Sequence, residues 1–126
     1  DLLFIHAIGA GYPAESIDWP KSPELKSVIE KMKKSGKVKF VGFSCHDAKR
    51  AEYLESAAEG GFLDALMIQN TAWLDQNTRL NKAIDKCHKA GIGLISMKQI
   101  AGQFQAAFFQ VNDIKVINDR VRGQDQ

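Results

Sequence analysis

Apolar residues along this chain gather into four short runs, each followed by a pattern with helical spacing. The runs cover residues 2–5, 38–43, 64–68 and 92–96. A short apolar run followed by an amphipathic helix is typical of a parallel sheet, because the helix returns the chain to the edge where the next strand begins. The sequence therefore predicts an α/β fold of four parallel strand–helix units.

Three helices between these runs have recognisable ends. The first begins after the cap Ser22 and ends before Gly36, the second begins near Asp47 and stops at Gly60, and the third covers about residues 77–91. One apolar face is expected on each helix, formed by Leu25, Val28, Ile29 and Met32, by Ala48, Ala51, Leu54 and Ala58, and by Leu80, Ala83, Ile84 and Cys87. After Gly102 the helical spacing resumes and predicts one long or two short closing helices.

The distance between successive runs suggests a barrel. It is roughly 25 to 36 residues, and a (β/α)8 TIM barrel of ~250 residues allots about 31 to each unit. We therefore expect residues 1–126 to form a single partial barrel domain. Because Asp1 opens directly on a strand, we expect an incomplete portion of a larger protein. A small doubly wound parallel sheet is the alternative, since strand–helix alternation is common to both folds.

The composition narrows the classes of protein. The chain has 126 residues, of which 44% are hydrophobic, which suits one modest core. Its formal net charge is +2, and the lysines of residues 31–39 suit a helix C-terminus better than a nucleic-acid surface. Two cysteines without paired spacing, no signal segment and no long apolar run predict a cytoplasmic protein that binds neither nucleic acid nor membrane.

His6 is the first candidate for chemistry, because it directly follows the first strand. The carboxyl ends of barrel strands deliver side chains into the mouth of the active site. A histidine there can orient or polarise a substrate carbonyl, and it can equally hydrogen-bond a neighbouring strand.

The segment after His6 contains a glycine pattern that we interpret as a loop. Gly9, Gly11 and Ala14 have the G-x-G-x-x-A spacing of a dinucleotide-binding turn. Such a turn must open a helix, whose amide groups then face the pyrophosphate. Here Pro13 interrupts the segment and the next helix begins only after Ser22, so the required geometry is missing.

Four segments together resemble the middle-to-late portion of an aldo-keto reductase barrel. They read DLLFIHAI, SGKVKFVGFSCHD, DALMIQNTAWLD and KAGIGLISMKQIAG, and the Gly-Lys-Val-x-x-x-Gly-x-Ser pattern of residues 36–44 is the most specific. The resemblance covers residues 1–102 and implies that the four strands are the fourth to seventh of eight. It further implies reduction of a small-molecule aldehyde or ketone with NADP or NAD as the cofactor.

The resemblance implies roles for individual residues. His6 matches the histidine that holds the substrate carbonyl. Ser44 matches a serine that holds the nicotinamide carboxamide together with an asparagine, and Cys45, whose thiol is a weak hydrogen-bonding group, replaces that asparagine. Met67 aligns with the family's glutamine. Gln69 lies two residues later along the same strand and faces the same side, so it offers an amide at a different depth in the barrel. The alternative is that Gln69 is a structural polar residue at the sheet end.

The resemblance also concerns the end of the fourth strand and the family's catalytic regions that this sequence does not contain. Met97 takes the place of the aromatic ring that stacks on nicotinamide in the family. The Met97–Lys98 pair resembles a branch of the family that often carries an appended iron–sulfur domain. Two cysteines are too few to hold such a cluster in this chain. The family's catalytic Tyr, Lys and Asp come from earlier strands, and neither Tyr12 nor Tyr53 has the place of the proton donor. We therefore do not expect reductase activity from this chain alone. Its open sheet edges predict a homo-oligomer or association with the missing half of the barrel.

Three other functions remain open at this point. The chain can be a non-catalytic barrel fragment or a binding scaffold. Lys98 at a strand end can form a Schiff base with a carbonyl substrate, as in a lyase. A metal site at the Cys45–His46 and Cys87–His88 pairs is conceivable by ligand type, but one pair ends a strand and the other lies on an outer helix.

Overall fold

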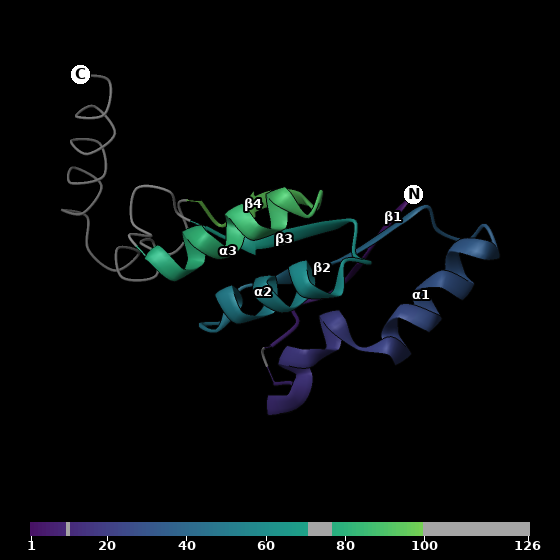
Figure 1. Cartoon of the computed structure of the whole chain (residues 1–126), viewed down its shortest axis with the longest axis horizontal. Helices are drawn as coiled ribbons and strands as arrows, with labels where there is room; N and C mark the ends of the chain where they lie inside the picture. The colour runs from purple at the N-terminus through teal and green to yellow at the C-terminus, as the bar shows by residue number, and fades with distance from the viewer. Residues whose placement is uncertain (10, 71–76, 100–126) are drawn as a thin grey trace, which may run out of the picture.

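A computed structural model describes residues 1–9, 11–70 and 77–99, which form a parallel four-stranded sheet with helices between its strands (Figure 1). The strands are β1 (Leu2–Ile5), β2 (Phe40–Cys45), β3 (Ala65–Gln69) and β4 (Gly93–Met97), and they lie in the order β1-β2-β3-β4. The connections carry a 3-10 helix η1 (Ala14–Lys21) and the α-helices α1 (Pro23–Lys34), α2 (Arg50–Gly60) and α3 (Thr78–Lys89). The predicted closing helices after Gly102 lie outside the described residues.

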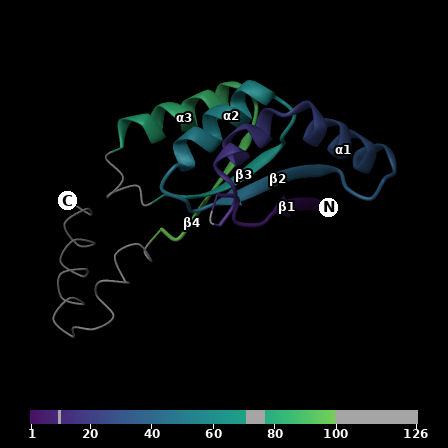
Figure 2. The ribbon, with the colours of Figure 1, turned by 90° about the horizontal axis from the view of Figure 1, so that it is seen from below.

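The described helices, η1 and α1 to α3, lie on the same side of the sheet, as Figure 2 shows. A doubly wound sheet reverses its strand order at a switch point and carries helices on both faces. Sequential parallel strands with an outer helix layer are the winding of a TIM barrel. The four units are thus part of a (β/α)8-type fold, as predicted, and the doubly wound alternative is excluded.

The hydrophobic core lies between the sheet and the helices. Along β3, buried Leu66 and Ile68 alternate with half-buried residues, and their register neighbours Phe43 and Cys45 on β2 are buried as well. Helices α2 and α3 close this layer with fully buried residues such as Leu54. Side chains at the alternate strand positions belong to the opposite face, which no described helix covers.

Local sequence explains where most elements begin and end. The Ser22 hydroxyl accepts a hydrogen bond from the Leu25 amide at 3.1 Å and caps α1. The Asn77 side chain accepts from the Arg79 and Leu80 amides and caps α3. Gly61 ends α2 in the left-handed conformation, with φ 66°.

Several predicted details are wrong. Helix α2 begins at Arg50 rather than near Asp47, because the Asp47 carboxylate accepts from the Lys49 amide at 2.8 Å and forms a turn there instead. Ala48 in that turn is therefore exposed. Val28 is 52% exposed, since α1 makes few contacts with the sheet. Strand β2 begins at Phe40, two residues later than predicted.

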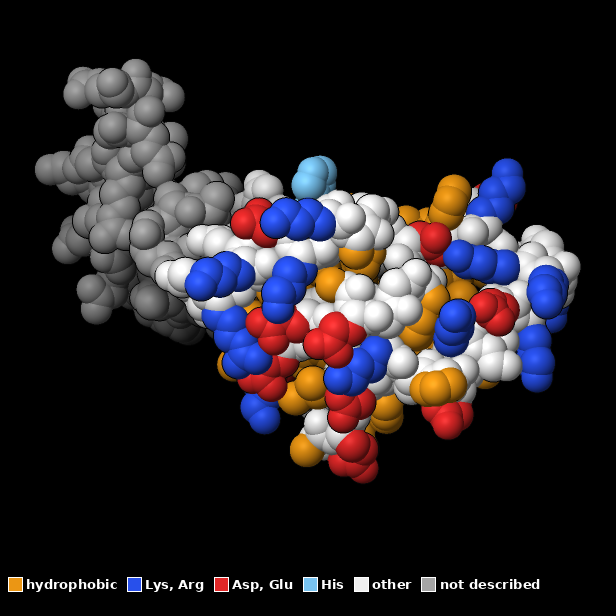
Figure 3. Space-filling model, in the orientation of Figure 1, with side chains coloured by type: hydrophobic (Ala, Val, Ile, Leu, Met, Phe, Trp, Pro, Cys, Tyr) orange, Lys and Arg blue, Asp and Glu red, His pale blue; other side chains and the backbone are white. Residues whose placement is uncertain are grey.

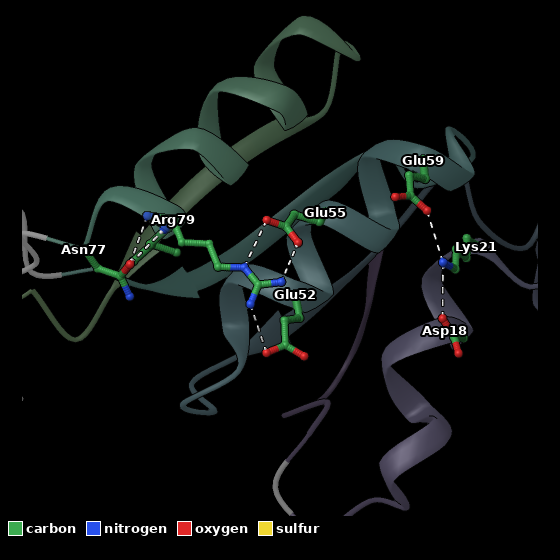
Figure 4. Close-up of polar contacts among 8 residues, drawn as sticks. Asp18, Lys21, Glu52, Glu55, Glu59, Asn77 and Arg79 are labelled. Carbon is green, nitrogen blue, oxygen red and sulfur yellow. Dashed lines mark hydrogen bonds and ion pairs between the residues drawn. The ribbon is translucent and has the colours of Figure 1, made fainter.

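Ion pairs connect neighbouring elements of the helix layer (Figure 4). The Arg79 guanidinium binds both carboxylate oxygens of Glu55, at 3.2 and 2.9 Å, and reaches Glu52 at 3.4 Å, which joins α3 to α2. Lys21 pairs with Asp18 and with Glu59, which joins η1 to α2. Acidic and basic side chains therefore intermingle on this face of the molecule (Figure 3).

Candidate functional site

The carboxyl ends of the four strands bring distant parts of the sequence to one edge of the sheet. His6 follows β1, Ser44 lies near the end of β2, and Gln69 ends β3. Gln69 lies directly opposite Met97, the last residue of β4. His6 and Met97, which are 91 positions apart in the chain, thus share the edge where barrel enzymes carry their active sites.

The register also places most of these side chains on the same face. Ser44 pairs with Met67, and Gln69 lies two positions beyond Met67 on the same strand, so the three share a face. Their face is the one opposite the buried Leu66 and Ile68. In a barrel, this uncovered face is the interior.

Ser44 is held in place by the chain that leaves β1. Its hydroxyl accepts a hydrogen bond from the Ala7 amide at 2.8 Å, and its carbonyl accepts from the Ile8 amide at 2.9 Å. The residue is 7% exposed. A hydroxyl that accepts one hydrogen bond keeps its own proton to donate, so Ser44 retains donor capacity.

The segment after His6 folds back onto helix α2. The Ser16 and Tyr53 hydroxyls share a hydrogen bond of 2.6 Å in the interior, and the Tyr12 and Trp19 rings pack edge to face. Residues 14–21 form the 3-10 helix η1, where we expected an irregular loop. The segment thus has a structural role, and His6 before it is exposed at the sheet edge.

A pocket lies at the opposite edge of the sheet. Its volume is about 530 Å³, and its lining includes Lys26, Phe40 and Phe62 together with Asp64, which immediately precedes β3. The Asp64 carboxylate is engaged there by the Val41 amide at 2.8 Å and by Lys33 at 2.6 Å. The pocket is therefore at the amino ends of the strands, remote from His6 and Ser44.

Comparison with known proteins identifies the family. The aldo/keto reductase family model matches residues 1–124. The chain belongs to the aldo/keto reductase family. No curated protein and no solved structure gives a significant match. The chain is thus related to a family of oxidoreductases, as its resemblance implied.

Cys45, for which the resemblance implies the place of an asparagine in the family, turns its side chain into the core. The thiol is fully buried at 0% exposure, and burial raises its pKa from 9.0 to about 11, against a smaller opposing effect of a hydrogen bond with the Asp47 backbone. It lies on the same face as Phe43, away from Ser44 and Gln69. A cofactor contact at Cys45 remains a prediction. Because the side chain faces the core, the backbone of Cys45 would have to make that contact.

Two further residues at the end of β4 carry predicted roles. Met97 is half-buried beside Gln69, in keeping with an apolar surface next to an amide. Lys98 is exposed and has the left-handed φ of 54°, which is uncommon for a residue with a side chain. An exposed lysine lacks the desolvation that activates a Schiff-base lysine, so the lyase alternative gains no support.

Two features of the site were not expected from the aldo/keto reductase pattern. The Ser96 hydroxyl donates to the Asn70 carbonyl at 2.9 Å, so backbone groups at Asn70 tie β3 to β4. Ala7 has a left-handed φ of 49°. No sequence signal identifies the hydrogen bond between Ser96 and Asn70. The left-handed φ of Ala7 was not evident either, because asparagine and glycine, rather than alanine, are the usual residues at such a φ.

The remaining candidates have structural partners. The Cys87 thiol donates to the Leu54 carbonyl at 3.3 Å, and Tyr53 is committed to Ser16. Among the described residues no three histidine, cysteine or acidic side chains gather as metal ligands. In the same part of the chain no helix combines the length and apolar character needed to cross a bilayer.

Proposed function

We propose that this chain supplies the carbonyl-orienting and nicotinamide-binding edge of a cytoplasmic NAD(P)H-dependent reductase of aldehydes or ketones. The observation that carries the proposal is the convergence of His6, Ser44 and Gln69 at the carboxyl edge of one sheet. This convergence occurs in a chain of the aldo/keto reductase family.

Each side chain has a chemical capacity that suits this role. The His6 imidazole can donate to a substrate carbonyl and so orient and polarise it. Ser44 offers a hydroxyl proton, and Gln69 offers both a donor and an acceptor, which matches the two hydrogen-bonding groups of a carboxamide. The bound cofactor supplies the hydride, and the residues of this chain supply binding and orientation.

We further propose that the chain acts as one portion of a larger assembly. Matching positions for the family's catalytic Tyr, Lys and Asp are not found on the strands described here. Exposed Leu2 and Leu3 on edge strand β1 and exposed Ile95 on edge strand β4 favour association with a second copy or with the rest of a barrel. Without such a partner the chain would be a binding scaffold rather than an enzyme.

Titration with NADPH and with NADH tests the proposal. We expect the cofactor's fluorescence to change on binding, and we expect Ser44→Ala and Gln69→Ala to weaken binding roughly tenfold each, as for lost hydrogen bonds to a polar ligand. Lys26→Ala, in the pocket at the opposite edge, is the matched control and should bind as the unmodified chain does. Equal binding of the cofactor by all variants would refute the assignment of cofactor binding to the carboxyl edge of the sheet.

Turnover provides the second part of the test. If the assembled protein consumes NADPH in the presence of an aldehyde such as benzaldehyde, His6→Ala should lower the rate by ~10²-fold or more with little change in NADPH affinity. A His6 variant with an undiminished rate would remove the carbonyl-orienting role.

A further inference from the structure

The chain leaves β1 through a bulge of one residue. Ile5 lies opposite Phe43, and a regular parallel ladder continued from there would bring the Ala7 amide to the Ser44 carbonyl. The Ile8 amide donates to that carbonyl instead, at 2.9 Å. One additional residue is therefore accommodated between Ile5 and Ile8, which redirects the chain where His6 projects.

The bulge requires a backbone conformation that alanine disfavours. Ala7 has φ 49°, where its Cβ crowds the following carbonyl oxygen. Such conformations persist when surrounding contacts determine them. The hydroxyl of Ser44 provides one contact through the Ala7 amide, and the carbonyl of Ser44 provides the next through Ile8.

Ile8 fixes the far side of the bulge. Its side chain is 1% exposed and belongs to the core that includes Phe43. His6 thus lies between a strand residue, Ile5, and a bulge whose two amides are both bound by Ser44. Its imidazole itself is exposed, so its position depends on the backbone that carries it.

We propose that Ser44 is a positioning residue for His6, in which the serine hydroxyl holds Ala7 in the left-handed conformation and thereby fixes the backbone that presents the imidazole. The remaining hydroxyl proton would let the same serine bind the cofactor amide. This second step rests on the proposed function; the positioning itself does not.

Nuclear magnetic resonance of the full chain without cofactor tests the positioning. We expect Ser44→Ala to shift the His6 imidazole signals and to raise the exchange rate of the Ala7 amide at least ~10-fold, because that amide loses its acceptor. His88, exposed on α3, is the internal control and should not shift. Unshifted His6 signals in folded Ser44→Ala, or equal shifts of both histidines, would overturn the proposal.

Rescue variants separate positioning from a general structural role. Ser44→Thr keeps the hydroxyl, and Ala7→Gly in the Ser44→Ala background removes the steric cost of the left-handed conformation. We expect either change to return the His6 signals toward those of the unmodified chain. A shift that neither variant reverses would contradict the mechanism.

Two measurements remain decisive if Ser44→Ala does not fold. In the unmodified chain the Ala7 amide should exchange at least ~10-fold more slowly than an unprotected amide, as expected for a partner-bound group. Ala7→Gly alone should raise the melting temperature by about 2–4 °C by relieving strain, with His6 unshifted. An unprotected Ala7 amide or a lower melting temperature would refute the proposal that the Ser44 hydroxyl holds Ala7 in the left-handed conformation. If the unmodified chain does not bind NADPH but its Ala7 amide is protected as expected, that result would count against the proposed function only.

Discussion

At the scale of single residues, Gly42 shows how closely the sheet is packed. A Cβ at this position would collide with the Ala65 carbonyl oxygen and lie 3.0 Å from the Phe4 ring. Because backbone cannot move aside cheaply, we expect Gly42→Ala to lower the free energy of unfolding by at least about 2 kcal/mol.

Gly93 on β4 is the matched control. The atom nearest to a Cβ there is 3.5 Å away, which is ordinary contact, so Gly93→Ala should change stability by less than about 1 kcal/mol. Urea unfolding of both variants measures the difference. Similar stabilities would show that β2 and β3 can separate to admit a methyl group.

The two buried thiols predict a loss of stability at alkaline pH. Burial raises the pKa values of Cys45 and Cys87 from 9.0 to about 11. Between pH 9 and 11 the unfolded chain releases these protons while the folded chain retains them, so stability falls as pH rises, by up to about 2–3 kcal/mol per thiol. Below pH 9 their contribution is constant.

Unfolding curves across this pH range measure the effect. A Cys45→Ala/Cys87→Ala variant should show a shallower decline, because other groups still titrate but the thiols are gone. The thiols of the folded chain should also resist Ellman's reagent at pH 7. Parallel pH profiles for the two proteins would contradict the prediction.

At the scale of elements, Asp64 joins several strands. Its carboxylate accepts from the Val41 amide on β2 and pairs with Lys33, while its carbonyl accepts from the Gly93 amide on β4 at 2.9 Å. Asp64→Ala leaves the Val41 amide without its acceptor and should cost about 1–3 kcal/mol. Lys33→Ala removes only the partly exposed pair and should cost less than about 1 kcal/mol. Equal effects in thermal unfolding would make the ion pair the main interaction.

The cap of α3 gives a second prediction at this scale. Asn77 satisfies two amides at the start of the helix, so Asn77→Ala should reduce stability by about 1 kcal/mol. Asn81 is exposed on the same helix, and Asn81→Ala should be neutral or slightly stabilising because alanine favours helix. A reversal of this order in urea unfolding would show that the cap contributes little.

At the scale of the whole molecule, the side of the sheet that no described helix covers predicts association. Leu2, Phe40 and Ile95 are 43%, 53% and 40% exposed on three of the strands. We expect light scattering to give a mass above 14.0 kDa at micromolar concentration. Ile95→Glu should shift the chain toward the monomer, while Val28→Glu on α1 should not. A monomer at all concentrations would refute self-association through the sheet.

The sequence predicted the fold more fully than the site. Four apolar runs with helices between them gave the parallel strands, and Ser22 and Asn77 marked helix starts, because these signals are local. The start of α2 was placed too early because the turn at Asp47 competes with the helix. The direction of the Cys45 side chain was also not evident, since one position of register decides which face a strand residue occupies.

The sequence by itself determined that this chain forms strand–helix units of the aldo/keto reductase family, since periodicity and short motifs are properties of neighbouring residues. Only the tertiary structure decided that the helices share one face, that Gln69 lies beside Met97, and that the Ser44 hydroxyl binds the Ala7 amide. These are contacts between distant segments. They depend on strand order and register, which are set by packing of the whole sheet rather than by any local pattern.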